Sequence, residues 1–459
     1  MATIVSYTAR PRRILGGVLL LAALAIGLLA YVLQGLGRYD QVPADLPVVG
    51  IGAAVTAALV YAVTQWRAPF ADPLIVPIAV LLNLLGIATI ASYDGAVDLF
   101  TSREAAYAGR QALWAGIGMI LAAAVVALLR DHRVLRRYTW VSALLGAMLL
   151  LLPLLPVVGR SINGSRIWIS VAGFSFQPAE LAKICFAVFF AGYLVSRRDT
   201  LALAGPKVLG VHLPRWSDFG PIVVAWAFGM AVLVFETDLG TSLLFFGLFV
   251  VMLYVATDRL SWLVIGAVMF IPPALLAVTQ VTRVRTRLAC WLDPLSGENY
   301  DRCYQINQGL FGMANGGLFG TGPGQARLNV VPYGHSDFIY SSLAEELGMV
   351  GVFAVLMLYL VLVERALRAA MGIADGFGTL LAGGLGFILA LQVFVVVGGV
   401  TRVIPLTGLV LPFLAAGGSS LVCNWIIIGL LVRLSDAARR PTPTRRPVEA
   451  PRRAEGVPA

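Results

Sequence analysis

The sequence predicts an all-α fold: a polytopic integral membrane protein with about twelve transmembrane helices and a large extracytoplasmic loop. The first observation is composition, because 59% of the 459 residues are hydrophobic and only 13% are charged, whereas soluble proteins carry about 25% charged residues. The second is that the apolar residues form runs of about 20, the length that crosses a bilayer. Folded in water, such a chain would expose more apolar surface than a soluble monomer tolerates. A soluble enzyme, a disordered regulator and a disulfide-stapled secreted domain are therefore excluded.

The first apolar run follows Arg10, Arg12 and Arg13 but has no small-residue cleavage site. We therefore interpret it as a retained span and not as a signal peptide. In chain order, the expected spans lie near residues 14–35, 46–66, 72–92, 111–129, 138–158, 180–196, 218–235, 239–256, 260–281, 338–363, 377–400 and 405–432.

The arginines orient these spans. An even number of spans places both termini on one side of the membrane, and the loops and tail on that side are rich in arginine: Arg130, Arg133, Arg136, Arg137, Arg197, Arg198, Arg365, Arg368, Arg433, Arg439, Arg440, Arg445, Arg446, Arg452 and Arg453. By the positive-inside rule this side is the cytoplasm. We expect residues 1–13 to be a cytoplasmic N-terminus and 434–459 a disordered basic cytoplasmic tail.

The net charge of +10 comes from 34 Lys and Arg against 24 Asp and Glu. In a membrane protein this excess reflects cytoplasmic loops, and no compact basic domain with interleaved aromatics is present, so nucleic acid is not an expected partner. The three histidines and four cysteines have no zinc-like spacing. No metal site is predicted from a motif.

Two segments on the opposite, outer face are informative: residues 158–179 and residues 282–337. A loop of about 55 residues inside a compact bundle is uncommon and usually functional. The active site is therefore expected on the outer face.

A helix is expected to begin after Gln177-Pro178, with Glu180 in its first turn and Lys183 one turn deeper on the same face. One interpretation is a local Glu180–Lys183 ion pair, or a lysine that snorkels to the headgroups. The other is functional, because a lysine that enters an apolar run is costly.

The long outer loop opens with Arg283, Arg285 and Arg287. Arginines on the outer face oppose the orientation rule, so they either form bridges to nearby carboxylates or bind an anionic substrate, since guanidinium groups suit phosphates. Glycines follow between residues 316 and 324, where they allow tight turns or close approach to a ligand.

The loop ends at Asp337, where the next span begins. Asp337 is either a helix N-cap or a general base in a partly dry cleft. Arg402 is a further outer-face cation. Cys290 and Cys303 share the long loop in an oxidising compartment, so we predict a disulfide between them.

Five motifs in this order resemble the SEDS family (FtsW, RodA and SpoVE): NGSRIWISVAGFSFQPAELAK, DLGTSLL, YQINQGLFGMANGGLFGTGPGQ, HSDFIYSSLAEELG and TGLVLPFLAAGGSS. The resemblance covers roughly residues 72–433 and is most like the RodA branch of actinobacteria. It implies a ten-helix glycosyltransferase core over residues 71–433 and two extra N-terminal helices over residues 14–70. Tyr333-Gly334, Glu236-Thr237 and Ala415-Ala416 depart from the family's usual residues.

The resemblance implies that Asp337 is the essential aspartate and that Lys183 and Glu180 are the motif lysine and its neighbouring glutamate. The remaining substrate-binding candidates belong to the same motifs or to the last outer loop: Arg166, Trp168, Gln177, Tyr304, Gln305, Gln308, His335, Ser336 and Arg402.

The reaction implied by the resemblance is polymerisation of lipid II, a polyprenyl-diphosphate-linked disaccharide pentapeptide, into glycan strands by inverting displacement. Such chemistry needs a base for the hydroxyl and positive charge for the departing diphosphate. No cofactor is required by a motif, although Mg²⁺ or Mn²⁺ would suit carboxylates and diphosphate. The expected protein partners are a class B penicillin-binding protein and other elongasome or divisome membrane proteins.

Two other functions fit parts of the sequence. A lipid II flippase or other transporter suits twelve spans and intramembrane charges, but such folds often contain inverted repeats and no convincing repeat is present. A membrane scaffold that recruits wall enzymes would leave Asp337 dispensable.

Overall fold

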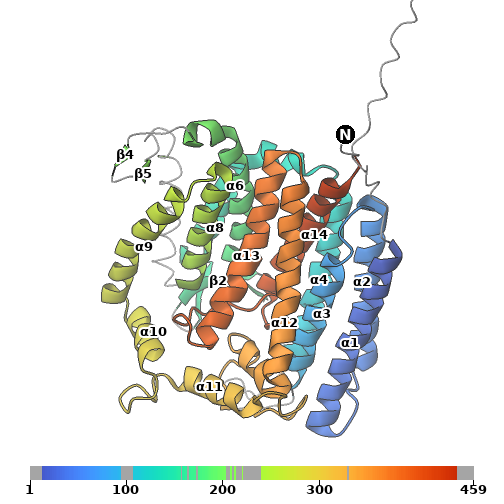
Figure 1. The fold of residues 1–459 in the computed structure, drawn as a ribbon. Helices are drawn as coiled ribbons and strands as arrows, with labels where there is room; N and C mark the ends of the chain where they lie inside the picture. Colours follow the sequence, from blue (N-terminus) through green and yellow to red (C-terminus); the bar gives the residue numbers. More distant parts are fainter. Residues whose placement is uncertain are drawn as a thin grey trace, which may run out of the picture.

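The computed structural model describes residues 13–94, 107–156, 158–162, 165–171, 174–202, 207–208, 211–212, 220, 239–327 and 330–441. Within these ranges the chain is a helical bundle (Figure 1), and ten helices are long and apolar enough to cross a membrane. The helices that make these spans are α1 (Arg13–Tyr39), α2 (Leu46–Arg67), α4 (Tyr107–Leu128), α5 (Thr139–Leu151, flanked by short 3₁₀ turns), α6 (Pro178–Ala202), α8 (Leu239–Thr257), α9 (Ser261–Gln280), α12 (Ile339–Gly372), α13 (Gly376–Val400) and α14 (Gly418–Arg439). A shorter apolar helix, α3 (Ile75–Ala91), packs among them. The predicted all-α, multi-pass membrane fold is confirmed.

The last predicted span differs from the structure at both ends. Its first part, residues 405–417, is irregular, and α14 begins only at Gly418. Proline at 405 and 412 removes backbone donors, and Gly408 and Phe413 have positive φ values of 83° and 66°, which a helix cannot accommodate. α14 then continues to Arg439, so the segment predicted to be a disordered tail from residue 434 is helical at its start.

The predicted span at 218–235 lies outside the described residues apart from Gly220, as do the predicted cytoplasmic segments before residue 13 and after residue 441.

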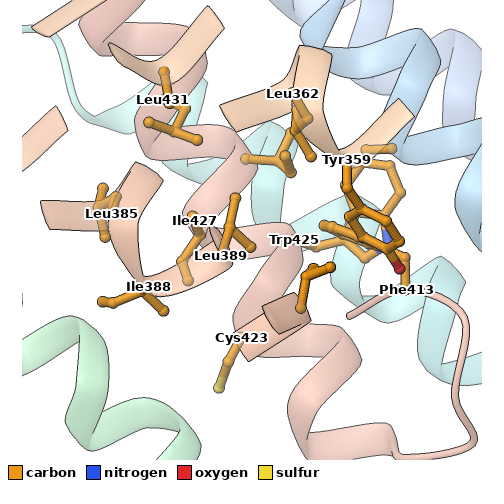
Figure 2. Packing of buried hydrophobic residues seen from close by; sticks show 14 of the residues in the cluster. Tyr359, Leu362, Leu385, Ile388, Leu389, Phe413, Cys423, Trp425, Ile427 and Leu431 are labelled. Atoms are coloured by element: carbon orange, nitrogen blue, oxygen red, sulfur yellow. The ribbon is translucent and has the colours of Figure 1, made fainter. Parts of the chain in front are cut away.

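The core of the bundle lies where α12, α13 and α14 meet, and Figure 2 shows Leu362, Leu389 and Ile427 side by side there. All three side chains are fully buried. Trp425 of α14 is also fully buried and faces α4, where a Cβ at Gly118 would lie 2.7 Å from the indole ring. The close approach of α4 and α14 therefore depends on a residue without a side chain.

The N-terminal hairpin, α1 and α2, lies along one side of the bundle (Figure 1). α1 packs against α3, and α2 packs against α4. Gly27 brings α1 close to Leu84, since a Cβ at position 27 would lie 2.4 Å from it. The opposite face of α1 exposes large apolar side chains such as Leu21 and Leu29, which suits a lipid-facing helix.

The long loop predicted at 282–337 contains two helices, α10 (Thr282–Leu292) and α11 (Tyr304–Gly316). Both lie at the same end of the bundle (Figure 1), which we call the α11 end. Cys290 and Cys303, the pair predicted from the sequence, form a disulfide that ties α10 to the start of α11.

Short strands, which the sequence did not predict, complete the structure. β1 (Gly159–Ile162), β2 (Ser165–Val171) and β3 (Phe174–Phe176) form an antiparallel sheet in that order, and β3 leads directly into α6. A second pair, β4 (Lys207–Val208) and β5 (Val211–His212), forms a two-residue ladder.

α12 is broken near the α11 end. Gly348 has φ +66° and separates a buried segment, Ile339–Leu347, from the long remainder of the helix. The break exposes backbone groups, and Met349 and Val350 donate instead to the carbonyls of Gly317 and Leu318 at 3.0 and 3.1 Å. The short segment is also attached to the loop that follows α11, because the carbonyls of Glu345 and Glu346 accept from the amides of Thr321 and Gly322 at 2.9 and 3.0 Å.

Candidate active site

Asp337 lies in the turn that leads into α12 and is half-buried. The turn is shaped by Tyr333, which has φ +56° and whose carbonyl accepts hydrogen bonds from the amides of Ser336 and Phe338 at 3.0 and 3.2 Å. Phe338 is fully buried against α11, where a Cβ at Gly309 would lie 2.6 Å from its ring. The local sequence therefore fixes Asp337 from both sides.

Asp337 borders a cavity of about 330 Å³. Four segments that are distant in sequence form its wall: the β2–α6 region, α10, the turn before α12, and the connection from α13 into α14. The lining residues are Ile167, Trp168, Gln177, Glu180, Arg283, Arg287, Tyr333, His335, Ser336, Asp337, Thr407, Gly408, Leu409, Val410, Ala416, Gly417, Ser419 and Ser420. We call this space the Asp337 cavity.

A second cavity of about 270 Å³, the side cavity, adjoins the first one. Both cavities share Arg283, Arg287 and Asp337 as lining residues. The disulfide and Gln305 of α11 also line the side cavity. A carboxylate and two guanidinium groups therefore face the space where the two cavities meet, a combination suited to an anionic, hydroxyl-bearing ligand.

Glu180 borders the Asp337 cavity, and Lys183 lies beneath it. The Lys183 Nζ is 2.5 Å from Glu180 Oε2 in an ion pair that is not an aligned hydrogen bond. Lys183 is 1% exposed, and its ammonium also donates to the side-chain oxygens of Gln392 and Asn424 at 3.0 and 3.2 Å. These contacts satisfy a buried charge that would otherwise be very unfavourable, and they fix the carboxylate that faces the cavity.

The loop arginines differ in their surroundings. Arg287 donates to the Thr407 carbonyl at 2.7 Å, which places its guanidinium at the cavity wall. Arg285 is exposed and donates to the carbonyl of Thr279 at 2.7 Å. Of the three arginines of α10, Arg283 and Arg287 line both cavities with Asp337, whereas Arg285 lines neither; Arg302, later in the loop, lines the side cavity.

Aromatic rings hold the turn that carries Asp337. The His335 ring stacks on Tyr107 with centroids 4.3 Å apart and meets the edge of Tyr93 at 5.6 Å. The His335 carbonyl accepts a hydrogen bond from the Ala416 amide at 2.9 Å. Burial raises the pKa of Tyr93 well above its ordinary value, so this phenol stays neutral.

The predicted site residues differ in their positions relative to the two cavities. Asp337, Glu180, Trp168, Gln177, His335 and Ser336 line the Asp337 cavity, and Gln305 lines the side cavity. Lys183 lies directly behind this wall. Tyr304 and Gln308 are on α11 and border neither cavity. Arg166 is in β2, but its side chain is outside the described residues.

Arg402 also lies away from both cavities. Its guanidinium donates to the Trp291 carbonyl at 2.8 and 3.1 Å and to the Leu292 carbonyl at 3.2 Å, and the Trp291 indole donates back to the Arg402 carbonyl at 3.1 Å. Arg402 therefore joins the end of α10 to the loop after α13.

The sequence reasoning missed Gln392 and Asn424. Both are fully buried, and they bond to Val410 and Ser420 as well as to Lys183. A signal was present, because polar residues inside apolar spans face the protein interior and mark functional sites.

No group of three or more His, Cys, Asp or Glu side chains is arranged to hold a metal ion in the part of the chain that the structure describes.

The fold and the cavity define a polytopic membrane protein with a charged site at one end of its bundle. Residues 72–440 match the model of the cell cycle protein family of FtsW, RodA and SpoVE, and the chain belongs to this family.

Curated relatives and solved structures support this family assignment. The chain is 42% identical to the peptidoglycan glycosyltransferase RodA of Mycobacterium tuberculosis over 97% of this chain and 96% of that protein. It is 34% identical to the stage V sporulation protein E of Bacillus subtilis over 80% of this chain and 98% of that protein. It superposes on the crystal structure of Thermus thermophilus RodA with a TM-score of 0.56 and 28% identity, covering 81% of this chain and 98% of that one.

A further similar structure comes from a peptidoglycan synthase complex that coordinates polymerisation and crosslinking. It has a TM-score of 0.63 and 26% identity and covers 81% of this chain and 99% of the other.

Proposed function

We propose that this chain is a peptidoglycan glycosyltransferase that polymerises lipid II, with the reaction at the Asp337 cavity. The observation that carries the proposal is that Asp337 shares one cavity wall with Arg283 and Arg287. A carboxylate that accepts a proton and cations that receive a diphosphate are the two groups this displacement needs. The Mycobacterium tuberculosis relative is named a peptidoglycan glycosyltransferase, which supports the same activity.

In the proposed reaction, a sugar hydroxyl of the acceptor attacks the anomeric carbon of the donor. A carbon–oxygen bond forms as the bond to the lipid diphosphate breaks, with inversion at the anomeric carbon, and the hydroxyl proton passes to Asp337. A positioned carboxylate base contributes on the order of 10²–10⁴-fold to such a step.

Arg283 and Arg287 are the proposed partners of the departing diphosphate, because both line the cavity beside Asp337. Lys183 has a different role in this proposal: it neutralises and orients Glu180 from below. Arg166 remains a candidate for diphosphate binding. Mg²⁺ or Mn²⁺ in this cavity would take most of its ligands from the substrate, since diphosphate oxygens suit hard cations.

The proposal places the α11 end on the outer face of the bacterial plasma membrane and both termini in the cytoplasm. The arginine-rich opposite end, which includes Arg133, Arg365 and Arg440, fits the positive-inside rule. We propose a class B penicillin-binding protein as the partner, within the elongasome or divisome, in keeping with the similar peptidoglycan synthase complex.

The test uses the purified protein in vesicles with labelled lipid II, with and without a class B penicillin-binding protein. Glycan strands in the product are the expected result. Lipid II movement across the vesicle bilayer without polymer would contradict the proposal and favour the alternative, a flippase.

A further inference from the structure

We infer that the N-terminal hairpin is part of the catalytic apparatus: Gln34 of α1 is a positioning residue that holds the segment Ile339–Leu347, and through it Asp337, against the cavity. This inference rests on the proposed function and adds to it a part of the chain that the family model, which begins at residue 72, does not include.

Gln34 is a buried amide between two elements of the core. It is 5% exposed near the end of α1. Its Nε2 donates to Glu346 Oε2 of α12, and its Oε1 accepts from the Ser92 hydroxyl at 3.0 Å. A buried carboxylate needs such donors, because an unpaired one costs several kcal/mol.

Glu346 joins Gln34 to the glycine-rich loop before α12. The carboxylate is 1% exposed, and its Oε1 accepts from the Gly324 amide at 3.2 Å. The hairpin also touches this loop directly, since Gln325 donates to the Gly37 carbonyl. A Cβ at Gly37 would lie 1.9 Å from the Pro323 carbonyl oxygen, so the two backbones are in contact.

The segment Ile339–Leu347 is also bonded to α11. Ser341 donates to the Gly309 carbonyl of α11 at 2.5 Å, and Glu345 accepts from Asn315 at 2.9 Å. Because Gly348 breaks α12 just beyond, the segment is held by these side contacts and not by the long helix. Only Phe338 separates Asp337 from the segment.

A second route runs from Gln34 through the end of α3. Ser92, which bonds to Gln34, is followed by Tyr93, whose hydroxyl lies 2.7 Å from the Ser342 hydroxyl and whose ring meets His335. The first route ends on Glu346, in the segment that follows Asp337, and the second ends on Ser342 of that segment and on His335 of the turn before it. Loss of the Gln34 contacts would therefore loosen the turn that presents the carboxylate.

The hairpin is not common to the whole family. The Thermus thermophilus structure is covered almost completely by 81% of this chain, whereas the Mycobacterium tuberculosis relative matches over 97% of it. In this chain, the end of α1 supplies a donor to Glu346 from outside the matched family core, residues 72–440.

The test exchanges the two polar groups. Gln34→Glu places a second carboxylate against Glu346, and Gln34→Glu/Glu346→Gln restores one amide and one carboxylate with the same acceptors for Ser92 and Gly324. Gln34→Met removes the hydrogen bonds without adding charge. It replaces Gln34→Glu in the test if Gln34→Glu does not fold. Leu36→Ala, on the exposed side of α1, is the matched control.

Polymerisation of lipid II is measured as kcat and KM on protein whose folding is checked by its thermal midpoint. We expect kcat of Gln34→Glu and Gln34→Met to fall about tenfold or more with KM unchanged, as a misplaced catalytic group predicts. The kcat of the double variant Gln34→Glu/Glu346→Gln should lie within about threefold of the wild-type kcat, since its hydrogen bonds are restored.

Wild-type kcat in both single variants, or a loss in Gln34→Glu that the double exchange does not restore, would overturn the inference alone. Absence of polymer from the wild-type protein would overturn the proposed function and this inference with it.

Discussion

The Lys183 ammonium lies 2.5 Å from Glu180 Oε2, one helical turn away, and both side chains are at least 95% buried, with relative exposures of 1% and 5%. The pair is supported from α13 and α14 by Gln392 and Asn424, which accept from the same ammonium. Buried pairs of this kind are seldom large net stabilisers, but they are strongly destabilising when one partner is removed. In this protein the pair holds the Glu180 carboxylate in place in the wall of the cavity that Asp337 also lines.

Removal of one partner of this pair should destabilise the protein. Lys183→Met leaves the Glu180 charge buried and unpaired, and we expect the free energy of unfolding to fall by about 3–5 kcal/mol. Glu180→Gln/Lys183→Met should recover most of that loss. Thermal or denaturant unfolding in detergent gives the values, and strictly additive effects of the two single changes would contradict a direct pair.

Arg287 and Arg285, both on α10, should differ in their effect on catalysis. Arg287→Gln removes a guanidinium from the cavity wall, and we expect kcat/KM for lipid II to fall by about 10²-fold or more, as for loss of a group that stabilises developing charge. Arg285→Gln is the matched control, since Arg285 is exposed and bonds to the Thr279 carbonyl. Equal losses in the two variants would argue against a diphosphate site at Arg287.

The disulfide should contribute to stability at the α11 end. Cys290 and Cys303 are 13 residues apart, and closing a loop of about 15 residues is worth about 3 kcal/mol in the chain-entropy model. Cys290→Ser/Cys303→Ser should therefore unfold at a lower temperature than the wild type. Reductant should shift the wild type in the same direction and leave the double variant unchanged; a reductant-insensitive wild type would refute this.

Asp94, in the turn after α3, should make stability depend on pH. Burial, opposed by hydrogen bonds from the amides of Tyr107 and Ala108 and reinforced by Asp45, raises the pKa of its carboxyl from 3.8 to about 6. Because the folded state holds the proton more tightly, this contribution to stability is complete below pH 3.8 and is lost as pH rises through about 6.

The thermal midpoint of the wild type should accordingly fall relative to that of Asp94→Asn between pH 4 and 6, roughly the interval between the two pKa values. Asp40→Asn, at the exposed end of α1, controls for removal of a nearby carboxylate. Parallel pH profiles for the wild type and Asp94→Asn would contradict the expectation.

Most of the helices could be predicted from the sequence because membrane spans are defined by length and apolarity alone. The same criterion failed at residues 405–417, which are apolar but contain prolines and positive φ angles. The strands β1–β3 were missed because they are only 4, 7 and 3 residues long, too short for a period-2 pattern to be distinguished from a loop.

The candidate site could also be predicted only in part from the sequence. Asp337, Glu180 and Lys183 stand out as charges at or inside apolar runs, which sequence displays directly. The groups that bond to a charged side chain cannot be predicted in this way. Arg402, for example, bonds to backbone carbonyls of α10 that are 111 and 110 residues away in the sequence. The role of Gln34 needs the same long-range knowledge, since Glu346 is 312 residues distant.

The role of Asp337 as the base of a glycosyl transfer is best measured by the rate of lipid II polymerisation by Asp337→Asn, compared with Asp301→Asn. Asp301 is an exposed aspartate between α10 and α11 that lines neither cavity. We expect Asp337→Asn to lose on the order of 10²–10⁴-fold in kcat with an unchanged thermal midpoint, while Asp301→Asn keeps the wild-type rate. Wild-type polymerisation by a folded Asp337→Asn protein would contradict it.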